Sequence, residues 1–255
     1  GTFITLFPQL IAGPIERYRD IRPQLERPEL SRQGFALGTR LFVIGLSKKL
    51  LLANAMGQMW EALKDSPRHN GFLGSWAGLI AFAFQIYFDF SGYSDMARGL
   101  GRMIGIRLKS NFNYPYAARS VTDFWRRWHI TLSGWFRDYV YIPLGGKRRG
   151  LPRQMLNILI VWGLTGLWHG ASLNFLLWGL YYAGLLMAEK LFLLKAYERL
   201  PAGLAWLSRL VTLAAVLLGW CIFAFTDFGA MRGYLASLWR GPAFSPVSLG
   251  IVKAY

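Results

Sequence analysis

Long uncharged stretches separated by short basic ones dominate the chain and predict helices that cross a membrane. The longest stretch, residues 154–188, lies between Arg153 and Glu189 and contains no Asp, Glu, Lys or Arg. One helix of that length would measure roughly 52 Å at 1.5 Å per residue, well beyond the ~30 Å of a bilayer's hydrocarbon core. The stretch therefore predicts two apolar segments that meet near residues 166–170.

Shorter apolar stretches predict further helices. Residues 72–88 are uncharged and just long enough for a span, and residues 210–226 form another apolar segment. A helix capped by Ser31 is expected from about Arg32 to Trp60, although Lys48 and Lys49 leave its depth in the membrane open. Residues 1–13 form an apolar start, and the polar segments 14–30, 64–71 and 98–119 are expected to be loops or turns.

Residues 121–142 show the clearest amphipathic pattern. Ser120 and Asp123 have the spacing of a capping box, and Pro143 ends the pattern. At 100° per residue, one face carries Trp125, Trp128, His129, Leu132, Trp135, Phe136 and Tyr139, and the other carries Arg126, Arg127, Ser133, Arg137 and Asp138. This separation predicts one helix that lies at the membrane interface or dips in from it.

Composition agrees with a polytopic membrane protein, because 54% of the residues are hydrophobic and 16% are aromatic. The net charge of +16 would indicate nucleic acid in a soluble protein. Here the basic residues flank apolar segments, which favours cytoplasmic loops beside anionic headgroups, with the lipid bilayer as partner and no nucleic acid. We expect a single membrane domain over 1–255, a fragment without its preceding helices, since Gly1 enters an apolar stretch directly.

Metal and disulfide chemistry are not expected. The chain has one cysteine, Cys221, which lies in an apolar stretch and is expected to be a small packing residue. The three histidines are far apart in sequence and show no metal-binding spacing.

Among the histidines and the acids of residues 89–95, four residues are candidates for a site and a fifth, His69, is not. His169 lies at the centre of the uncharged stretch, where an ionisable side chain is costly, so it should face a protein-lined cavity; the alternative is a structural hydrogen bond to a neighbouring helix. His129 lies among tryptophans, where a packing histidine is the usual alternative. His69 is expected to be solvated. Asp89 and Asp95 either line a reaction chamber or cap the helix that follows.

Five motifs cover most of residues 7–181. They are FPQLIAGPIERYRDI (7–21), QIYFDFSGYSDMARGLGRMIGI (85–106), NFNYPY (111–116), DFWRRWHITLSGWFRDYVYIPLGG (123–146) and GLWHGASLNFLLWGLY (166–181). Together and in this order they resemble the membrane-bound O-acyltransferase family, in the alginate O-acetyltransferase branch.

This resemblance implies an all-α, polytopic integral membrane protein of the bacterial inner membrane. Transmembrane and interfacial or re-entrant helices would surround a central tunnel. The family's invariant histidine maps to His169 of the Trp168-His169-Gly170 motif, and its second signature position maps to His129 beside Trp128. The resemblance implies transfer of an acetyl group from acetyl-CoA or an acyl-carrier thioester to a hydroxyl of a polysaccharide, with an extracytoplasmic acetyltransferase partner and no bound cofactor. Alginate, cellulose and peptidoglycan stay open as acceptors, and a neighbouring branch transfers D-alanine to teichoic acid.

Histidine chemistry suits such a transfer. A hydroxyl needs a base when it attacks a thioester, so our hypothesis makes His169 the general base, while His129 binds the substrate or polarises the thioester carbonyl. Further candidates for substrate or donor contacts are Asp89, Asp95, Arg126, Arg127, Trp128 and Trp168, and the loop residues Lys147, Arg148 and Arg149 could add positive charge for the donor.

Two functions of other classes stay open from the sequence. In a transporter or flippase, His169 would relay protons, but inverted repeats would be expected and none is evident. In a membrane scaffold that anchors a soluble enzyme, His169 would be replaceable.

Overall fold

The computed structural model describes residues 2–10, 13–64 and 67–255, and every regular element in these ranges is helical. The α-helices are α1 (Thr2–Thr5), α2 (Tyr18–Glu26), α3 (Arg32–Ser47), α4 (Asn54–Lys64), α5 (Pro67–Met103), α6 (Val121–Arg127), α7 (Ile130–Phe136), α8 (Leu151–His169), α9 (Leu173–Ala188), α10 (Leu194–Glu198), α11 (Trp206–Ala224), α12 (Phe228–Ser237) and α13 (Pro246–Ala254). Short π-helical turns occur at Lys48–Ala53, Arg137–Tyr141 and Glu189–Leu193.

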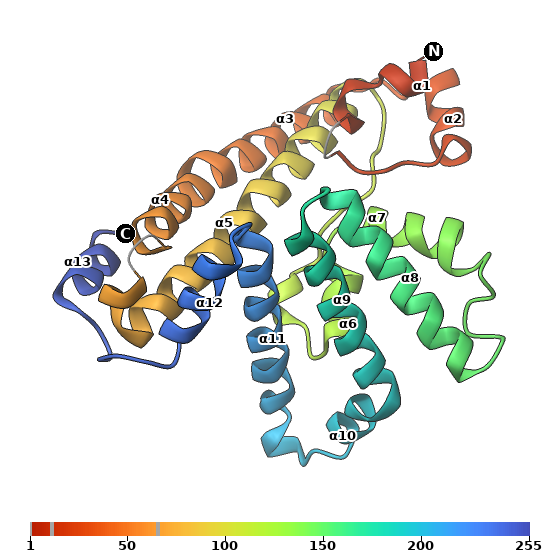
Figure 1. Ribbon diagram of the computed structural model, residues 1–255. Helices are drawn as coiled ribbons and strands as arrows, with labels where there is room; N and C mark the ends of the chain where they lie inside the picture. The colour runs from red at the N-terminus through yellow and green to blue at the C-terminus, as the bar shows by residue number, and fades with distance from the viewer. Residues whose placement is uncertain (1, 11–12, 65–66) are drawn as a thin grey trace.

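One side of the molecule is formed by two long helical segments that lie side by side (Figure 1). The first consists of α3, the π-helical turn Lys48–Ala53 and α4, and the second is α5. Glycines allow the close approach: a Cβ built on Gly45 would lie 2.4 Å from the carbonyl oxygen of Gly92. Ion pairs cross the same contact, since Lys48 Nζ lies 2.6 Å from Asp95 Oδ2 and Lys49 Nζ lies 2.8 Å from an oxygen of Asp89. The two lysines that left the depth of this helix open are therefore paired with carboxylates.

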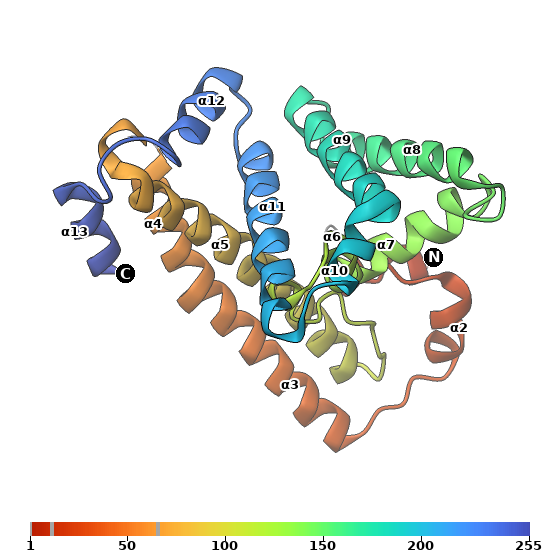
Figure 2. The same cartoon turned by 90° about the horizontal axis from the view of Figure 1, so that it is seen from below.

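The uncharged stretch 154–188 forms two helices, as predicted. Helix α8 ends at His169, and α9 begins at Leu173 and returns along α8. Gly166 and Gly179 face each other across the contact: a Cβ on Gly179 would lie 2.3 Å from the carbonyl oxygen of Trp162. Helix α11 packs on α9 (Figure 2), and Tyr181 donates a hydrogen bond of 2.8 Å to the carbonyl of Ala215.

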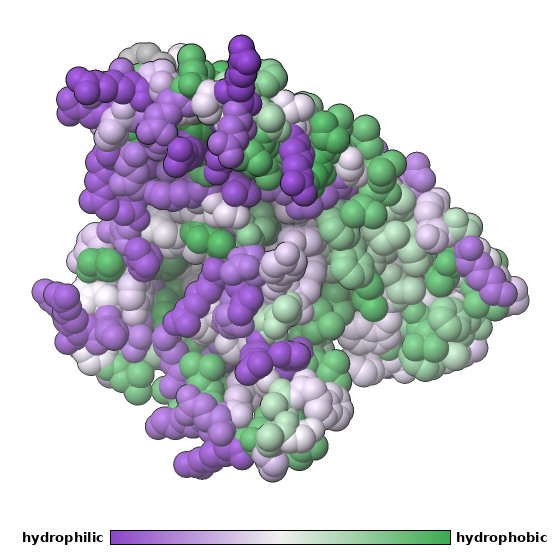
Figure 3. Space-filling view, turned by 180° about the vertical axis from the view of Figure 1, so that it is seen from behind, coloured by the Kyte–Doolittle hydropathy of each residue, from purple (hydrophilic) through white to green (hydrophobic). Residues whose placement is uncertain are grey.

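Three helical segments are long and apolar enough to cross a membrane, namely Asn70–Met103, Leu173–Glu198 and Ala202–Ala224. This confirms an all-α fold with membrane-spanning helices. Helix α8, which was also expected in the membrane, is not among them. In the view of Figure 3, hydrophilic side chains gather over the side that carries α1 and α2, whereas hydrophobic side chains cover the side of α4 and α13. In this view the molecule therefore has a hydrophilic side and a hydrophobic side.

Three expected loops are shorter than predicted. Segment 14–30 contains α2. Helix α5 begins at Pro67, within the expected turn 64–71, has a kink at Gly71 (φ 71°), and continues to Met103, within the expected loop 98–119. The side chain of His69 lies outside the described residues. Asp89 and Asp95 lie within α5 and do not cap a following helix. The physical reason is their pairing with Lys48 and Lys49, which allows the helix to continue past the apolar run.

The single helix predicted over 121–142 is wrong. It breaks after Arg127 into α6 and α7, and His129 has a left-handed backbone (φ 44°, ψ 53°). The loop that precedes α6 supplies the missing partners: Ile130 N donates to the carbonyl of Asn111 at 3.0 Å, and Asn113 N donates to the carbonyl of Arg127 at 3.0 Å. The periodic pattern continues across the break, so the pattern alone does not show it.

The expected interfacial face of aromatic rings lies partly in the core. The ring of Trp125 packs 4.6 Å from that of Trp162 and 4.8 Å from that of Tyr182, measured between centroids. Trp220 and Cys221 of α11 are buried in the same cluster, which confirms the packing role predicted for the cysteine. The α6–α7 segment is thus held between the long α5 and the α8–α9–α11 helices.

Candidate active site

His129 lies at the break between α6 and α7, and its side chain is buried, with 5% of its surface exposed. Its ring meets Phe90 edge-on at 4.7 Å between centroids. Asn111, which has no exposed surface, places its side-chain oxygen 3.4 Å from Nδ1 of His129 and also bonds Thr131. The loop before α6 therefore fixes both the backbone and the ring of His129.

His169 is the last residue of α8, and rings from three helices surround it. Its imidazole lies 4.9 Å from Trp168 on its own helix, 4.9 Å from Trp178 on α9 and 5.3 Å from Phe223 on α11, all between centroids. The close α8–α9 contact at Gly166 and Gly179 sets this position. The side chain faces protein, as predicted for an ionisable group at that point of the chain.

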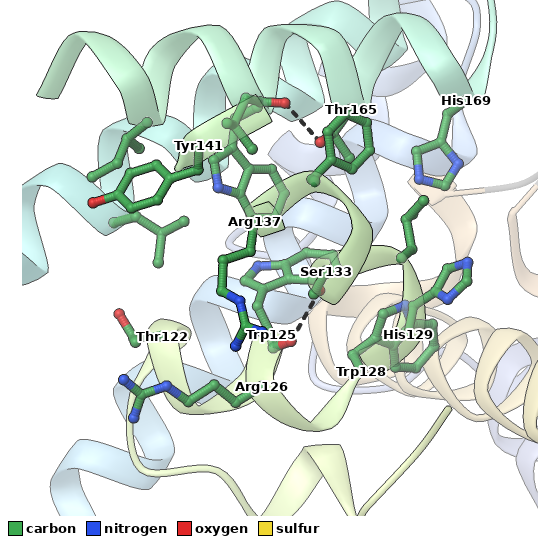
Figure 4. A pocket seen from close by; sticks show the side chains of 16 residues that line it. Thr122, Trp125, Arg126, Trp128, His129, Ser133, Arg137, Tyr141, Thr165 and His169 are labelled. Carbon is green, nitrogen blue, oxygen red and sulfur yellow. Dashed lines mark hydrogen bonds between the residues drawn. The ribbon is translucent and has the colours of Figure 1, made fainter. Parts of the chain in front are cut away.

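Two cavities meet at the histidines. The central cavity, of about 230 Å³, lies between α6, α7 and α8 (Figure 4). The aromatic cavity, of about 450 Å³, lies against α5 and α11. Trp128, His129 and His169 line both cavities and so form the wall between them. In Figure 4 the two imidazoles lie at one end of the central cavity and Arg126 lies at the other. Both cavities therefore reach the same three side chains.

A third space, the basic cavity, adjoins the central one. It has a volume of about 480 Å³, and its cations are Arg17, Lys109, Arg126 and Arg137. Trp125, Arg126, Ser133 and Arg137 line both the basic and the central cavity. The three cavities thus form a series from the basic side of the molecule to the histidines and on to the aromatic cavity.

Most cations of the basic cavity are already paired. Asp138 forms ion pairs with both Arg17 and Arg137. Lys109 donates a hydrogen bond of 2.5 Å to Asp20, which lowers the pKa of that carboxyl. Arg126 is exposed and has no hydrogen-bond or ion-pair partner among the described residues. It is therefore the cation of this set that is available to an incoming anion.

The two candidate aspartates of α5 separate in the structure. Asp89 lines the aromatic cavity with both histidines and pairs with Lys49. Asp95 lines a different, polar cavity of about 170 Å³, where it pairs with Lys48 and with Arg98 at 3.1 Å. Only Asp89 therefore lies where it could meet a group that is bound beside the histidines.

The remaining candidates have distinct places. Trp128 is buried between the two cavities. The ring of Trp168 is half exposed, and its centroid lies 6.1 Å from that of His129 and 4.9 Å from that of His169. Arg127 does not line the three cavities; its Nε donates to Asp123 at 2.8 Å. No group of three or more His, Cys, Asp or Glu side chains that could hold a metal occurs in the described part of the chain.

Glu189 is a residue that the sequence reasoning missed. Its side chain is buried, and its two carboxylate oxygens accept hydrogen bonds from the backbone N–H groups of Val121 (2.5 Å) and Thr122 (2.7 Å). A carboxylate is favoured at a helix N-terminus, where N–H groups lack partners. Glu189 thus anchors α6, the helix that leads to Trp128 and His129. An acid directly after an apolar stretch was the only signal for it.

Replacing Glu189 by alanine should destabilise the fold by about 3 kcal/mol, because one buried and one partly buried N–H group lose a charged acceptor. Thermal unfolding of the purified protein in detergent would measure the effect. The matched control is Glu198→Ala, which removes an exposed acid and should shift stability by no more than about 0.5 kcal/mol. Equal melting temperatures for the two variants would contradict the anchoring role.

A comparison with known protein families assigns the chain to one of them. The model of the membrane-bound O-acyltransferase family matches residues 2–231. The chain belongs to the membrane-bound O-acyltransferase family. His129 and His169 lie within the matched region, and the family assignment made from the five motifs is confirmed.

Curated relatives in the O-acyltransferase family differ in what they modify. A probable alginate O-acetylase of Azotobacter vinelandii is 41% identical over 226 residues, which cover 88% of this chain and 44% of the relative. A peptidoglycan O-acetyltransferase of Helicobacter pylori is 39% identical, covering 87% and 42%. A teichoic acid D-alanyltransferase of Bacillus subtilis is 30% identical, covering 89% and 61%. The chain thus spans about half the length of these relatives.

Proposed function

We propose that the protein transfers an acetyl group from a phosphorylated thioester, acetyl-CoA, to a hydroxyl group of an exported polysaccharide. The donor enters through the basic and central cavities, and the acceptor enters through the aromatic cavity. The observation that carries this proposal is the wall of Trp128, His129 and His169 that both inner cavities share. Two substrates that approach from opposite sides would meet at these side chains.

His169 acts as the general base in this proposal. The acceptor oxygen attacks the carbonyl carbon of the thioester while its proton passes to the imidazole of His169. The C–S bond then breaks, and the proton moves from His169 to the departing thiolate. The ester of the acceptor and a free thiol are the products. Rings of Trp168, Trp178 and Phe223 surround His169, which supports exclusion of water that would otherwise hydrolyse the thioester.

The basic cavity binds the phosphate groups of the donor. Its four cations come from three separate parts of the chain, and Arg126 has no partner within the described ranges. A guanidinium suits this task because it presents several N–H donors in a fixed plane to phosphate oxygens. Arg126 lies at the end of the central cavity opposite the histidines (Figure 4), so a phosphate held there leaves an extended thioester arm free to reach them.

Arg126→Gln should raise the KM for acetyl-CoA about tenfold, since one charge-assisted hydrogen bond to phosphate is lost. The difference from wild type should shrink at high salt, because the interaction is partly exposed. Initial rates at several salt concentrations would measure it. Arg119→Gln, which removes an exposed arginine outside the three cavities, serves as the control for net charge. An unchanged KM in the Arg126 variant would count against phosphate binding at this position.

The acceptor is a hydroxyl of an exported glycan, and the place of action is the bacterial inner membrane with a periplasmic acetyltransferase as partner. Relatives named alginate O-acetylase and peptidoglycan O-acetyltransferase, each about 40% identical, support a glycan acceptor. The relative named teichoic acid D-alanyltransferase, at 30% identity, makes D-alanyl transfer the second candidate.

Incubating the purified protein with labelled acetyl-CoA or with a D-alanyl carrier protein, each with glycan acceptors, separates these candidates. We expect label on the glycan from acetyl-CoA alone. Label from the D-alanyl carrier alone would favour the second candidate. Label from neither donor, together with substrate counter-flow in liposomes, would favour a transporter.

A further inference from the structure

We infer that Asn111 holds His129 in the neutral tautomer whose proton is on Nδ1, so that Nε2 offers a lone pair to the bound substrate. Asn111 is therefore a positioning residue for His129. The tautomer follows from hydrogen bonds in the protein alone; only the task of Nε2 rests on the proposed function.

Backbone donors define the orientation of the Asn111 amide. The backbone N–H of Thr131 lies 3.2 Å from the side-chain atom assigned as Oδ1 of Asn111. A backbone N–H can only donate, so the atom that receives it must be the oxygen. The amide turned by 180° would place its NH₂ group against this N–H, with no acceptor between two donors.

The hydrogen bonds of the Thr131 hydroxyl indicate the same orientation of the Asn111 amide. It accepts a hydrogen bond of 2.9 Å from the backbone N–H of Ile15 and donates one of 2.6 Å to Oδ1 of Asn111. The chain of bonds therefore runs from the N–H of Ile15 through Thr131 to the amide oxygen. Two backbone N–H groups, which can only donate, thus set the direction of the bonds to the side-chain oxygen of Asn111. The NH₂ group of Asn111 is buried and has no hydrogen-bond partner among the described residues.

The same oxygen faces Nδ1 of His129 at 3.4 Å. Since Oδ1 is an acceptor, the ring nitrogen beside it must carry the proton. All three side chains are buried, with exposed fractions of 0% for Asn111, 5% for His129 and 7% for Thr131, so water does not compete. A buried imidazolium would need a compensating charge. No carboxylate is a hydrogen-bond or ion-pair partner of His129 in the ranges that the structure describes.

A neutral ring with its proton on Nδ1 has a lone pair on Nε2. His129 lines the central and aromatic cavities, so Nε2 is the nitrogen left for a ligand in them. It accepts a hydrogen bond from a donor group of the substrate, such as a second sugar hydroxyl or an amide N–H of the thioester arm. It cannot donate to the thioester carbonyl, so this role replaces the carbonyl contact considered from the sequence.

Nitrogen NMR of histidine-labelled protein tests the tautomer directly, because the chain has three histidines. Spectra of ¹⁵N-histidine samples of the purified protein in detergent, with His69→Ala and His169→Ala used for assignment, identify the signals of His129. We expect Nδ1 protonated and Nε2 unprotonated at neutral pH. Protonation of Nε2 alone, or of both nitrogens, would overturn the inference even if no variant of Asn111 folds.

Two variants separate positioning from simple packing. Asn111→Leu removes the acceptor, so the His129 signals should change to the other tautomer or a mixture. Transfer should fall about 10- to 100-fold, the range typical when the group that orients a metal-binding histidine is removed. Thr131→Val removes a hydroxyl from the same buried network but keeps the backbone N–H that orients Asn111, so the tautomer should be retained. The same spectrum for wild type and Asn111→Leu, or the same change in both variants, would contradict the inference.

These readouts also distinguish a failure of the proposed function from a failure of this inference. Protonated Nδ1 without acetyl transfer to any glycan would leave the tautomer standing and remove the proposed reaction. Acetyl transfer with a proton on Nε2 of His129 would support the proposed reaction and overturn the inferred tautomer.

Discussion

Replacing His169 by alanine is expected to lower the rate of acyl transfer by roughly 10²- to 10⁴-fold, the usual contribution of a general base. The protein should remain folded, because the side chain is only partly buried and forms ring contacts in place of a buried hydrogen-bond network. The measurement is kcat with acetyl-CoA and a glycan acceptor, alongside the thermal unfolding of the same sample.

His69→Ala is the control for loss of a histidine as such, and it should transfer at the wild-type rate. The KM of the His169 variant for the donor should change little, because the phosphate site that we propose at Arg126 lies at the far end of the central cavity. Transfer by His169→Ala within a factor of about three of wild type would exclude the general-base role assigned here.

Replacing Gly179 by alanine is expected to separate α8 from α9, costing about 3 kcal/mol of stability and most of the transfer activity. The added Cβ would lie 2.3 Å from the carbonyl oxygen of Trp162 and 3.3 Å from Gly166. Both neighbours are backbone atoms, so the helices themselves must move. His169 ends α8 and contacts Trp178 of α9, and its position depends on this spacing.

Gly184→Ala is the matched control, since it adds the same methyl group to the same helix where nothing lies within 4 Å. Alanine is a better helix former than glycine, so this variant should be as stable as wild type or slightly more stable. Thermal unfolding and transfer rates of the two variants can be compared directly. If Gly179→Ala melts at the temperature of Gly184→Ala, the close α8–α9 contact is wrong.

The sequence predicts the helices whose boundaries are marked by charge or by capping residues. The change from Arg153 to an uncharged stretch marks α8, and the length of that stretch requires a second helix, α9. Ser31 caps α3 as expected, accepting a hydrogen bond from Gly34 N. The sequence also predicts that His169 faces protein, because an ionisable side chain in the middle of an uncharged stretch is costly in contact with lipid.

The break at His129 could not be predicted in the same way. Its support comes from Asn111 and Asn113, which lie in a loop whose course depends on the rest of the fold. The extent of α5 depends likewise on Lys48 and Lys49, some forty residues before their partners on α5. Local periodicity contains none of this information, because each feature is a contact between distant segments.

The basic cavity was also only partly foreseen. The sequence makes Arg126 a candidate for donor binding, but it places Arg17 and Lys109 in loops and Arg137 on a helix surface. The structure brings all four together at one cavity. Positive charge in separate loops favours one side of the membrane, yet it does not show which cations converge. Asn111 lay within a quoted motif, but nothing in the sequence indicated that its amide contacts the ring of His129.

The most direct test of the central claim, that an acyl group passes between two cavities at the histidines, is transfer across a sealed membrane. Vesicles containing the protein would receive labelled acetyl-CoA on the face that exposes the basic cavity and a glycan acceptor on the other face. We expect labelled glycan with the wild-type protein and background label with His169→Ala. Equal labelling by both proteins, or release of labelled acetate without any labelled glycan, would contradict it.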